Sequence, residues 1–266
     1  MNYPTSPAVI GLLLAINSID GGLNFVYADV QYSMNVGINA AARNFLNNNQ
    51  QYVAIAYASP LSERNTVVVS LAFAPDSSNI SFDYGWTLYT SPNCPANDFD
   101  VINIAVTQEN VGSERGYSFD GATIFSDGMG VNGYISLYYD ASSESEPVSA
   151  GLAQYIYNTS QRPNNPAPIN YHTLNPFETL SIPVFGSTIW IFVANNITEG
   201  SVIPINILRP VSDSASATSS NAGASSASQA TIRQISRYLP VDLSNASQTT
   251  VHFDLEINAF AYGSYP

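Results

Sequence analysis

Residues 250–260 read TVHFDLEINAF, and every second residue of this stretch is apolar. The apolar positions are Val251, Phe253, Leu255 and Ile257, and the polar positions are His252, Asp254, Glu256 and Asn258. A period of two places the apolar residues on one face of a β-strand and the polar residues on the other. This stretch therefore predicts a strand with one buried face and one wet face.

Similar β-branched and aromatic runs recur along the chain, at residues 23–32, 52–58, 66–74, 80–90, 101–107, 117–125, 134–139, 180–184, 188–194 and 202–208. Turn-forming residues separate the runs, for example at 126–128, 131–133 and 195–196, and the proline-rich residues 162–168 predict a loop. Many short strands between such turns are typical of an all-β, antiparallel β-sandwich. Helical patterns are scarce. Residues 34–46 predict one short helix, and residues 148–157 are a second candidate.

A segment rich in serine and alanine, residues 212–230, interrupts this pattern. Its small, polar composition predicts an excursion from a β-sandwich body at residues 23–211. The remaining residues, 231–266, are too few to fold alone, so we expect their strand to complete the sandwich or to join that of a neighbouring subunit. Before the body, residues 1–22 contain the apolar run AVIGLLLAI at 8–16. This run predicts either a first strand or an arm that docks on a neighbour.

The chain has 266 residues and a formal net charge of -13 at pH 7, with 20 acidic residues against 7 basic ones. All the basic residues are arginines, and they are scattered singly. Binding to nucleic acid needs clustered basic residues, and anionic lipids repel an acidic surface, so we expect neither partner. A bilayer-spanning helix needs about 20 apolar residues, so residues 8–16 do not predict a membrane span. Because Arg43 is the first basic residue, we expect no secretory signal peptide either.

Few side chains in the sequence suggest a catalytic, metal-binding or disulfide-forming role. Cys94 is the single cysteine, so it predicts no internal disulfide. His252 and Asp254 stand two residues apart, as a base and its orienting carboxylate could, and His172 lies in a predicted loop. Three acidic pairs have the same spacing: Asp98/Asp100, Glu144/Glu146 and Asp254/Glu256. We interpret all of these as surface groups, with a cation site or glycosidase-like catalysis left open at the acidic pairs. Since no phosphate-binding, hydrolase or metalloprotease motif is present, the sequence predicts no enzyme, no catalytic residue, no cofactor and no metal.

Sequons for asparagine glycosylation occur at Asn79, Asn158, Asn196 and Asn245. A chain this rich in Asn, Ser and Thr contains about as many by chance, so their number is no sign of glycosylation. If the chain carries glycans, we expect them on Asn245, which follows the serine-rich segment.

The β-rich pattern over residues 23–260 and the low content of charged residues resemble those of jelly-roll coat proteins of viruses, including viruses of archaeal hosts. The resemblance involves no diagnostic motif, so it carries over no functional residue. It implies a non-enzymatic structural subunit that assembles, with copies of itself and other virion proteins, into a capsid shell or a surface turret. Two alternatives stay open. One is a subunit of an extracellular donor-strand filament or surface layer, with residues 8–16 as the donor strand. The other is a carbohydrate-binding module, which the many aromatic and acidic residues would suit.

Overall fold

The computed structural model describes residues 32–58, 62–83, 85–142, 144–158, 163–183, 187–211, 234–245 and 248–265. All of them fall within one compact unit, residues 31–266. This part of the chain is mostly strand with a single α-helix, which confirms the all-β, sandwich-like fold. The predicted N-terminal arm at 1–22, the strand at 23–32 (except Tyr32) and the excursion at 212–230 lie outside the described residues.

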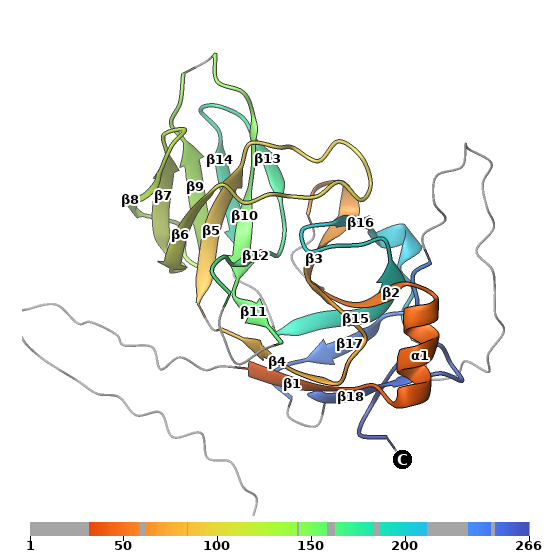
Figure 1. The fold of residues 1–266 in the computed structure, drawn as a ribbon. Coiled ribbons are helices and arrows are strands. Elements are labelled where there is room, and N and C mark those ends of the chain that lie inside the picture. Colours follow the sequence, from red (N-terminus) through yellow and green to blue (C-terminus); the bar gives the residue numbers. More distant parts are fainter. Residues whose placement is uncertain are drawn as a thin grey trace, which may run out of the picture. The chain divides into compact units, whose positions relative to one another are not determined.

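A first sandwich consists of two five-stranded sheets (Figure 1). The first sheet has the order β11 (Ile156–Tyr157), β4 (Ser78–Phe82), β1 (Tyr32–Gly37), β18 (Thr250–Asp254) and β19 (Ala259–Tyr262). The second sheet has the order β16 (Val202–Pro204), β3 (Thr66–Phe73), β2 (Gln51–Tyr57), β15 (Thr188–Asn195) and β17 (Leu239–Asp242). Two short 3-10 helices, η1 (Glu63–Asn65) and η2 (Ile205–Ile207), lie next to β3 and β16 along the chain.

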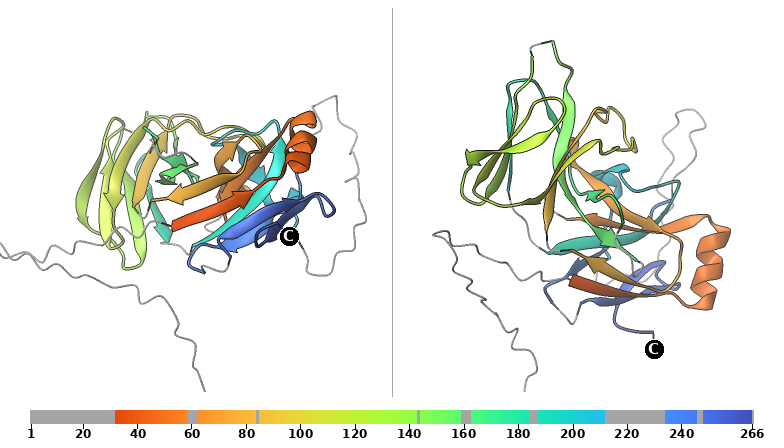
Figure 2. Two further views of the ribbon diagram at one scale, coloured as in Figure 1. Left: turned by 60° about the horizontal axis from the view of Figure 1, so that its bottom comes forward. Right: turned by 60° about the vertical axis from the view of Figure 1, so that its left-hand side comes forward.

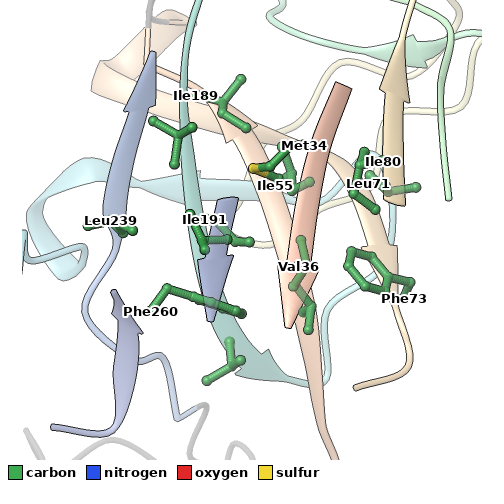
Figure 3. Packing of buried hydrophobic residues seen from close by; sticks show 14 of the residues in the cluster. Met34, Val36, Ile55, Leu71, Phe73, Ile80, Ile189, Ile191, Leu239 and Phe260 are labelled. Carbon is green, nitrogen blue, oxygen red and sulfur yellow. The ribbon is translucent and has the colours of Figure 1, made fainter. Parts of the chain in front are cut away.

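The core of this sandwich lies between its two sheets. Met34 and Val36 of β1 meet Ile55 of β2, Ile191 of β15 and Phe260 of β19 (Figure 3). All five side chains are buried because the inward-facing positions alternate with outward-facing ones along each strand. The strands β17, β18 and β19 of the C-terminal tail thus take part in the sheets of their own chain.

Helix α1 (Ala40–Asn48) closes one end of this core. It begins after Asn39, whose side-chain Oδ1 accepts a hydrogen bond from the Ala42 N–H at 2.8 Å, as an N-cap residue does. Ala42 and Leu46 are four residues apart, so they lie on one face of the helix and are both buried in the core.

A second sandwich lies in the chain between β4 and β15. Its first sheet has the order β12 (Ala167–Pro168), β10 (Val148–Gln154), β5 (Trp86–Ser91) and β6 (Val106–Val111), and β13 (His172–Leu174) also pairs with β10. Its second sheet has the order β14 (Thr179–Pro183), β9 (Tyr134–Tyr139), β7 (Arg115–Phe119) and β8 (Ile124–Met129). Figure 2 shows these strands, mostly yellow and green, grouped apart from the strands of the first sandwich. Leu88, Ile135, Leu137 and Leu152 are fully buried in a separate core between the two sheets.

Along the described residues the chain crosses between the sandwiches four times, after β4, β10, β11 and β14. The chain leaves β4 through Asp83 and returns from β10 through Tyr155, and the Asp83 N–H donates to the Tyr155 carbonyl at 3.0 Å. Trp86 packs against both cores, and Tyr89 and Tyr171 belong to a third buried cluster that includes residues of both sandwiches.

Both helical predictions need correction. Residues 34–37 belong to β1, where Met34 and Val36 are buried and Ser33 and Asn35 are exposed, so the period there is two and the helix begins at Ala40. The candidate helix at 148–157 is wrong, since these residues form β10 and β11. Nearly all of β10 is buried, and a strand buried on both faces has no polar alternation to identify it.

Several predicted strands are divided or displaced. Residues 250–260 form a hairpin of β18 and β19, so the predicted alternation is wrong beyond Asp254, and Leu255 lies exposed in the turn. Residues 80–90 form β4 and β5 in different sandwiches, and residues 117–125 form β7 and β8 around a turn at Asp120. Of residues 101–107 only the last two are in a strand, and residues 202–208 form β16 and then η2.

Some of the turn predictions are confirmed and others are wrong. The turn at 131–133 is confirmed, with the Tyr134 N–H donating to the Val131 carbonyl at 3.0 Å, and Asn196 adopts a left-handed turn conformation with φ 53°. The turn at 126–128 is wrong, because these residues belong to β8. The loop at 162–168 is wrong at its end, where Ala167–Pro168 form β12. Two pairings are parallel rather than antiparallel, β1 with β18 and β7 with β9.

Candidate functional site

The structure gives His252 and Asp254 separate structural roles. His252 Nδ1 is 2.9 Å from the Gly263 carbonyl, and its ring lies against Tyr265 with 4.7 Å between the ring centroids. The Asp254 carboxylate accepts the Glu256 N–H at 2.8 Å within the turn that follows β18. These contacts hold the C-terminal hairpin together. They do not pair the His252 ring with the Asp254 carboxylate, as the spacing of the two residues allowed.

His172 is half-buried at the start of β13 and lies near Glu63. Burial lowers the pKa of His172 below its ordinary value of 6.5, and the negative charge of Glu63 opposes this shift. The Glu63 carboxylate accepts the Thr173 N–H at 2.6 Å and the Thr173 hydroxyl at 2.8 Å, so it joins η1 of the first sandwich to β13 of the second.

His172 is expected to make the fold less stable in mild acid. Because its pKa is lower in the folded chain than in the unfolded one, the unfolded chain binds more protons between the folded pKa and 6.5. The free energy of unfolding should therefore fall as the pH drops from 6.5 towards that lower pKa. In His172→Gln this part of the decline should disappear, as measured by urea unfolding at a series of pH values. An unchanged slope in the variant would contradict this assignment.

The other candidate groups lie apart from one another. Asp100 accepts the N–H groups of Ala96 and Asn97 at 2.9 and 2.8 Å, which closes the turn after Cys94, a partly exposed free thiol. Glu144 and Glu146 are exposed. Within the described ranges, no three His, Cys, Asp or Glu side chains are grouped so that they could hold a metal ion.

The four sequons differ in their surroundings. Asn79 lies in β4 and donates its side-chain N–H to Asn35 Oδ1 at 2.8 Å, and Asn158 follows β11. Asn196 and Asn245 are both exposed in turns. Asn245 donates its backbone N–H to the Asp242 carbonyl at 3.0 Å.

Unlike these scattered groups, the edge strands of the sheets differ from one another in a regular way. An edge strand has backbone N–H and C=O groups that can pair with another chain, and proteins protect such edges with proline, short strands, bulges or charge. Four edge strands each contain a proline: Pro168 in β12, Pro183 in β14, Pro204 in β16 and Pro240 in β17. The edge strands β11 and β19 have 2 and 4 residues. Among the described strands, the longest edge strands are β6 and β8, with 6 residues each and no proline.

The two long edges differ in chemistry. The exposed or half-buried positions of β6 include Gln108, Glu109 and Asn110, which are polar. On β8, residues 125–129 are all exposed, and Phe125 and Met129 are 41% and 94% accessible. Among the described residues β8 pairs with β7 alone, and it forms the outer margin of its sheet (Figure 1).

Two more exposed apolar side chains lie in the turn that follows β8 and at the start of β9. The Gly130 N–H donates to the Glu114 carbonyl at 2.7 Å, and the Glu114 N–H donates to the Tyr134 carbonyl at 3.1 Å. These bonds hold the turn after β8 beside the start of β9, where Val131 is 58% and Tyr134 is 40% accessible. We call Phe125, Met129, Val131 and Tyr134 the β8 edge patch.

The one charged residue of β8 is turned away from the edge. Asp127 lies at an irregularity of the β7–β8 register, next to Gly128 with φ 110°. Its carboxylate accepts a hydrogen bond from the Ser118 hydroxyl on β7 at 2.7 Å, so the side chain lies over the strand pair. The bulge at Asp127 is one of the features by which edge strands limit pairing, but it leaves Phe125 and Met129 exposed.

Comparisons of the chain with protein-family models, with curated proteins and with solved structures found no match. No helix in the described part of the chain is long and apolar enough to span a bilayer. Sequence reasoning missed the β8 edge patch, because residues 126–128 read as a turn. The prolines of the other edge strands are present in the sequence, but they mark edges only once the strand order is known.

Proposed function

We propose that this protein is a non-enzymatic structural subunit that assembles with copies of itself into a virion capsid shell or surface turret. The observation that carries the proposal is the β8 edge patch, which has exposed apolar side chains and no proline, whereas the other edges among the described strands carry prolines, are short or are polar. Large exposed apolar groups around unpaired backbone are typical of surfaces that bind another chain.

The composition supports contacts between copies. Charged residues make up 10% of the chain, and it contains 17 tyrosines. Protein interfaces are enriched in tyrosine and depleted in lysine and glutamate. Copies with a net charge of -13 repel one another, so apolar contacts and hydrogen bonds must provide the attraction, and added salt or a lower pH should favour assembly. Other virion proteins would be further partners, and any glycan on the exposed Asn245 would face the solvent.

Assembly through the β8 edge patch should depend on its apolar side chains. Replacing Met129 and Val131 together by serine removes apolar area that contributes about 1.5–3 kcal/mol per buried side chain, so the association constant should fall at least about tenfold. Light scattering with size-exclusion chromatography and electron microscopy, at neutral and at low pH, would measure this. Phe177→Ser is the matched control, since Phe177 is 56% exposed in the loop before β14 and should leave assembly unchanged.

Closed particles or rings of wild-type protein would support the shell or turret, and threads would favour the filament alternative. Monomers of wild-type protein under all conditions would overturn the proposal. So would a Met129/Val131 variant that assembles as well as wild type.

A further inference from the structure

We propose that the β8 edge of one copy receives residues 8–16 of a neighbouring copy as an added β-strand. This inference rests on the proposed function and names the segment that makes the contact. An extended segment that adds to an exposed edge gains main-chain hydrogen bonds and places alternate side chains on each face of the sheet.

No described strand pairs with the outer side of β8. Both long edge strands, β6 and β8, lie on the same side of the second sandwich and contact each other across it. Val111 of β6 and Ile124 of β8 belong to the core at this side and are 6% accessible each. A strand added next to β8 would extend its sheet beyond the edge and lie beside Phe125 and Met129.

Residues 8–16 have the composition of a buried strand. The sequence AVIGLLLAI contains no proline and no charged residue, and the first charged residue of the chain is Asp20. At about 3.3 Å per residue these nine residues would span about 30 Å, longer than β8 with its 6 residues. A run this apolar is costly to leave in water, so it needs a partner surface.

Charge favours this segment over a second β8 strand as the partner. Two acidic residues lie near the ends of the edge, Glu114 before β7 and Asp120 in the β7–β8 turn. Two β8 strands that faced each other would bring these acidic groups together, and like charges opposite each other destabilise strand pairing. Residues 1–19 carry no charged side chain, so they can approach the edge without this repulsion.

The length of the chain before β1 permits exchange between copies. β1 begins at Tyr32 in the first sandwich, whereas β8 belongs to the second. The 15 residues between Ile16 and Tyr32 span up to about 50 Å when extended. Each copy then donates one strand and receives another. This is a head-to-tail contact, which produces rings where the rotation between copies closes and filaments where it does not.

A mixing experiment with two full-length variants tests the exchange. Leu12→Asp/Leu14→Asp disables the donor segment and keeps the edge, and Phe125→Asp/Met129→Asp disables the edge and keeps the donor. Both edge positions are exposed, so the second variant should keep its melting temperature, which circular dichroism verifies. Each variant alone should be monomeric, and an equimolar mixture should form a 1:1 heterodimer, detected by light scattering and native mass spectrometry.

A synthetic peptide of residues 6–18 gives a second readout. It should bind the donor-disabled chain at least about tenfold more tightly than the edge-disabled chain in a titration. A donor-disabled chain that assembles like wild type would overturn this inference while leaving the proposed function in place. A mixture that stays monomeric would overturn it as well, because an intact segment and an intact edge would both be present and would not pair. Wild-type protein that never assembles would overturn both proposals.

Discussion

A chain that ends at residue 233 is expected not to fold its first sandwich. It would lack β17, β18 and β19, and β18 lies inside its sheet between β1 and β19. Phe253 and Phe260 are fully buried and pack edge-to-face, with 5.4 Å between their ring centroids. Without them the first sandwich would expose its core, so the truncated chain should show no cooperative thermal transition for that sandwich by calorimetry.

A single substitution tests the same prediction through the free energy of unfolding. Phe253→Ala should lower the free energy of unfolding by about 3–5 kcal/mol, the usual cost of removing a buried phenylalanine. Leu255→Ala is the matched control on the same hairpin, where the side chain is 37% exposed, and the cost should stay within about 0.5 kcal/mol. A chain ending at 233 that still gave the near-ultraviolet dichroism and the complete transition of wild type would contradict the structure.

Gly151→Ala is expected to destabilise the second sandwich strongly. Gly151 lies in β10, and a Cβ atom there would be 2.2 Å from the backbone oxygen of Asn170. That oxygen accepts the Tyr89 hydroxyl at 2.6 Å, and Asn170 Oδ1 accepts the Leu152 N–H at 2.8 Å. Any shift of Asn170 would therefore strain the packing and break two buried hydrogen bonds. The combined loss is about 3–5 kcal/mol.

The expected fall in melting temperature for Gly151→Ala is about 10 °C, measured by calorimetry. Gly112→Ala is the control, because no atom lies within 4 Å of the position that its Cβ would take. It should leave the melting temperature within about 2 °C of wild type. Equal melting temperatures for the two variants would show that β10 and Asn170 are not in close contact.

The period of two in the sequence was enough to predict an all-β fold, because that period reflects strand geometry directly. The division into two sandwiches was not visible. Residues 80–90 read as one run, yet β4 ends at Phe82 and β5 begins at Trp86 in another sheet. Only contacts between distant strands decide where such a run breaks. The β10 strand was missed for a related reason, since its small residues and burial on both faces leave no alternation.

The candidate site depended even more on long-range contacts. A strand becomes an edge only through the order of strands in its sheet, and the sequence does not show that order. Ser126, Asp127 and Gly128 have the composition of a turn, but pairing with β7 makes them part of β8. The prolines at 168, 183, 204 and 240 were visible in the sequence, and their shared role became clear only once the sheets were known.

The insertion of one sandwich into the other also sets the order in which a newly made chain can fold. Every strand described for the second sandwich lies within residues 86–183, so a ribosome has supplied all of them before β15 emerges. The first sandwich must wait for β18 to reach β1, which at about 5–20 residues per second takes roughly another 4–14 s. During that interval the nascent chain holds β1 to β4 with their apolar faces uncovered. A chaperone would therefore act mainly on the first sandwich, whose synthesis begins before that of the second sandwich and ends after it.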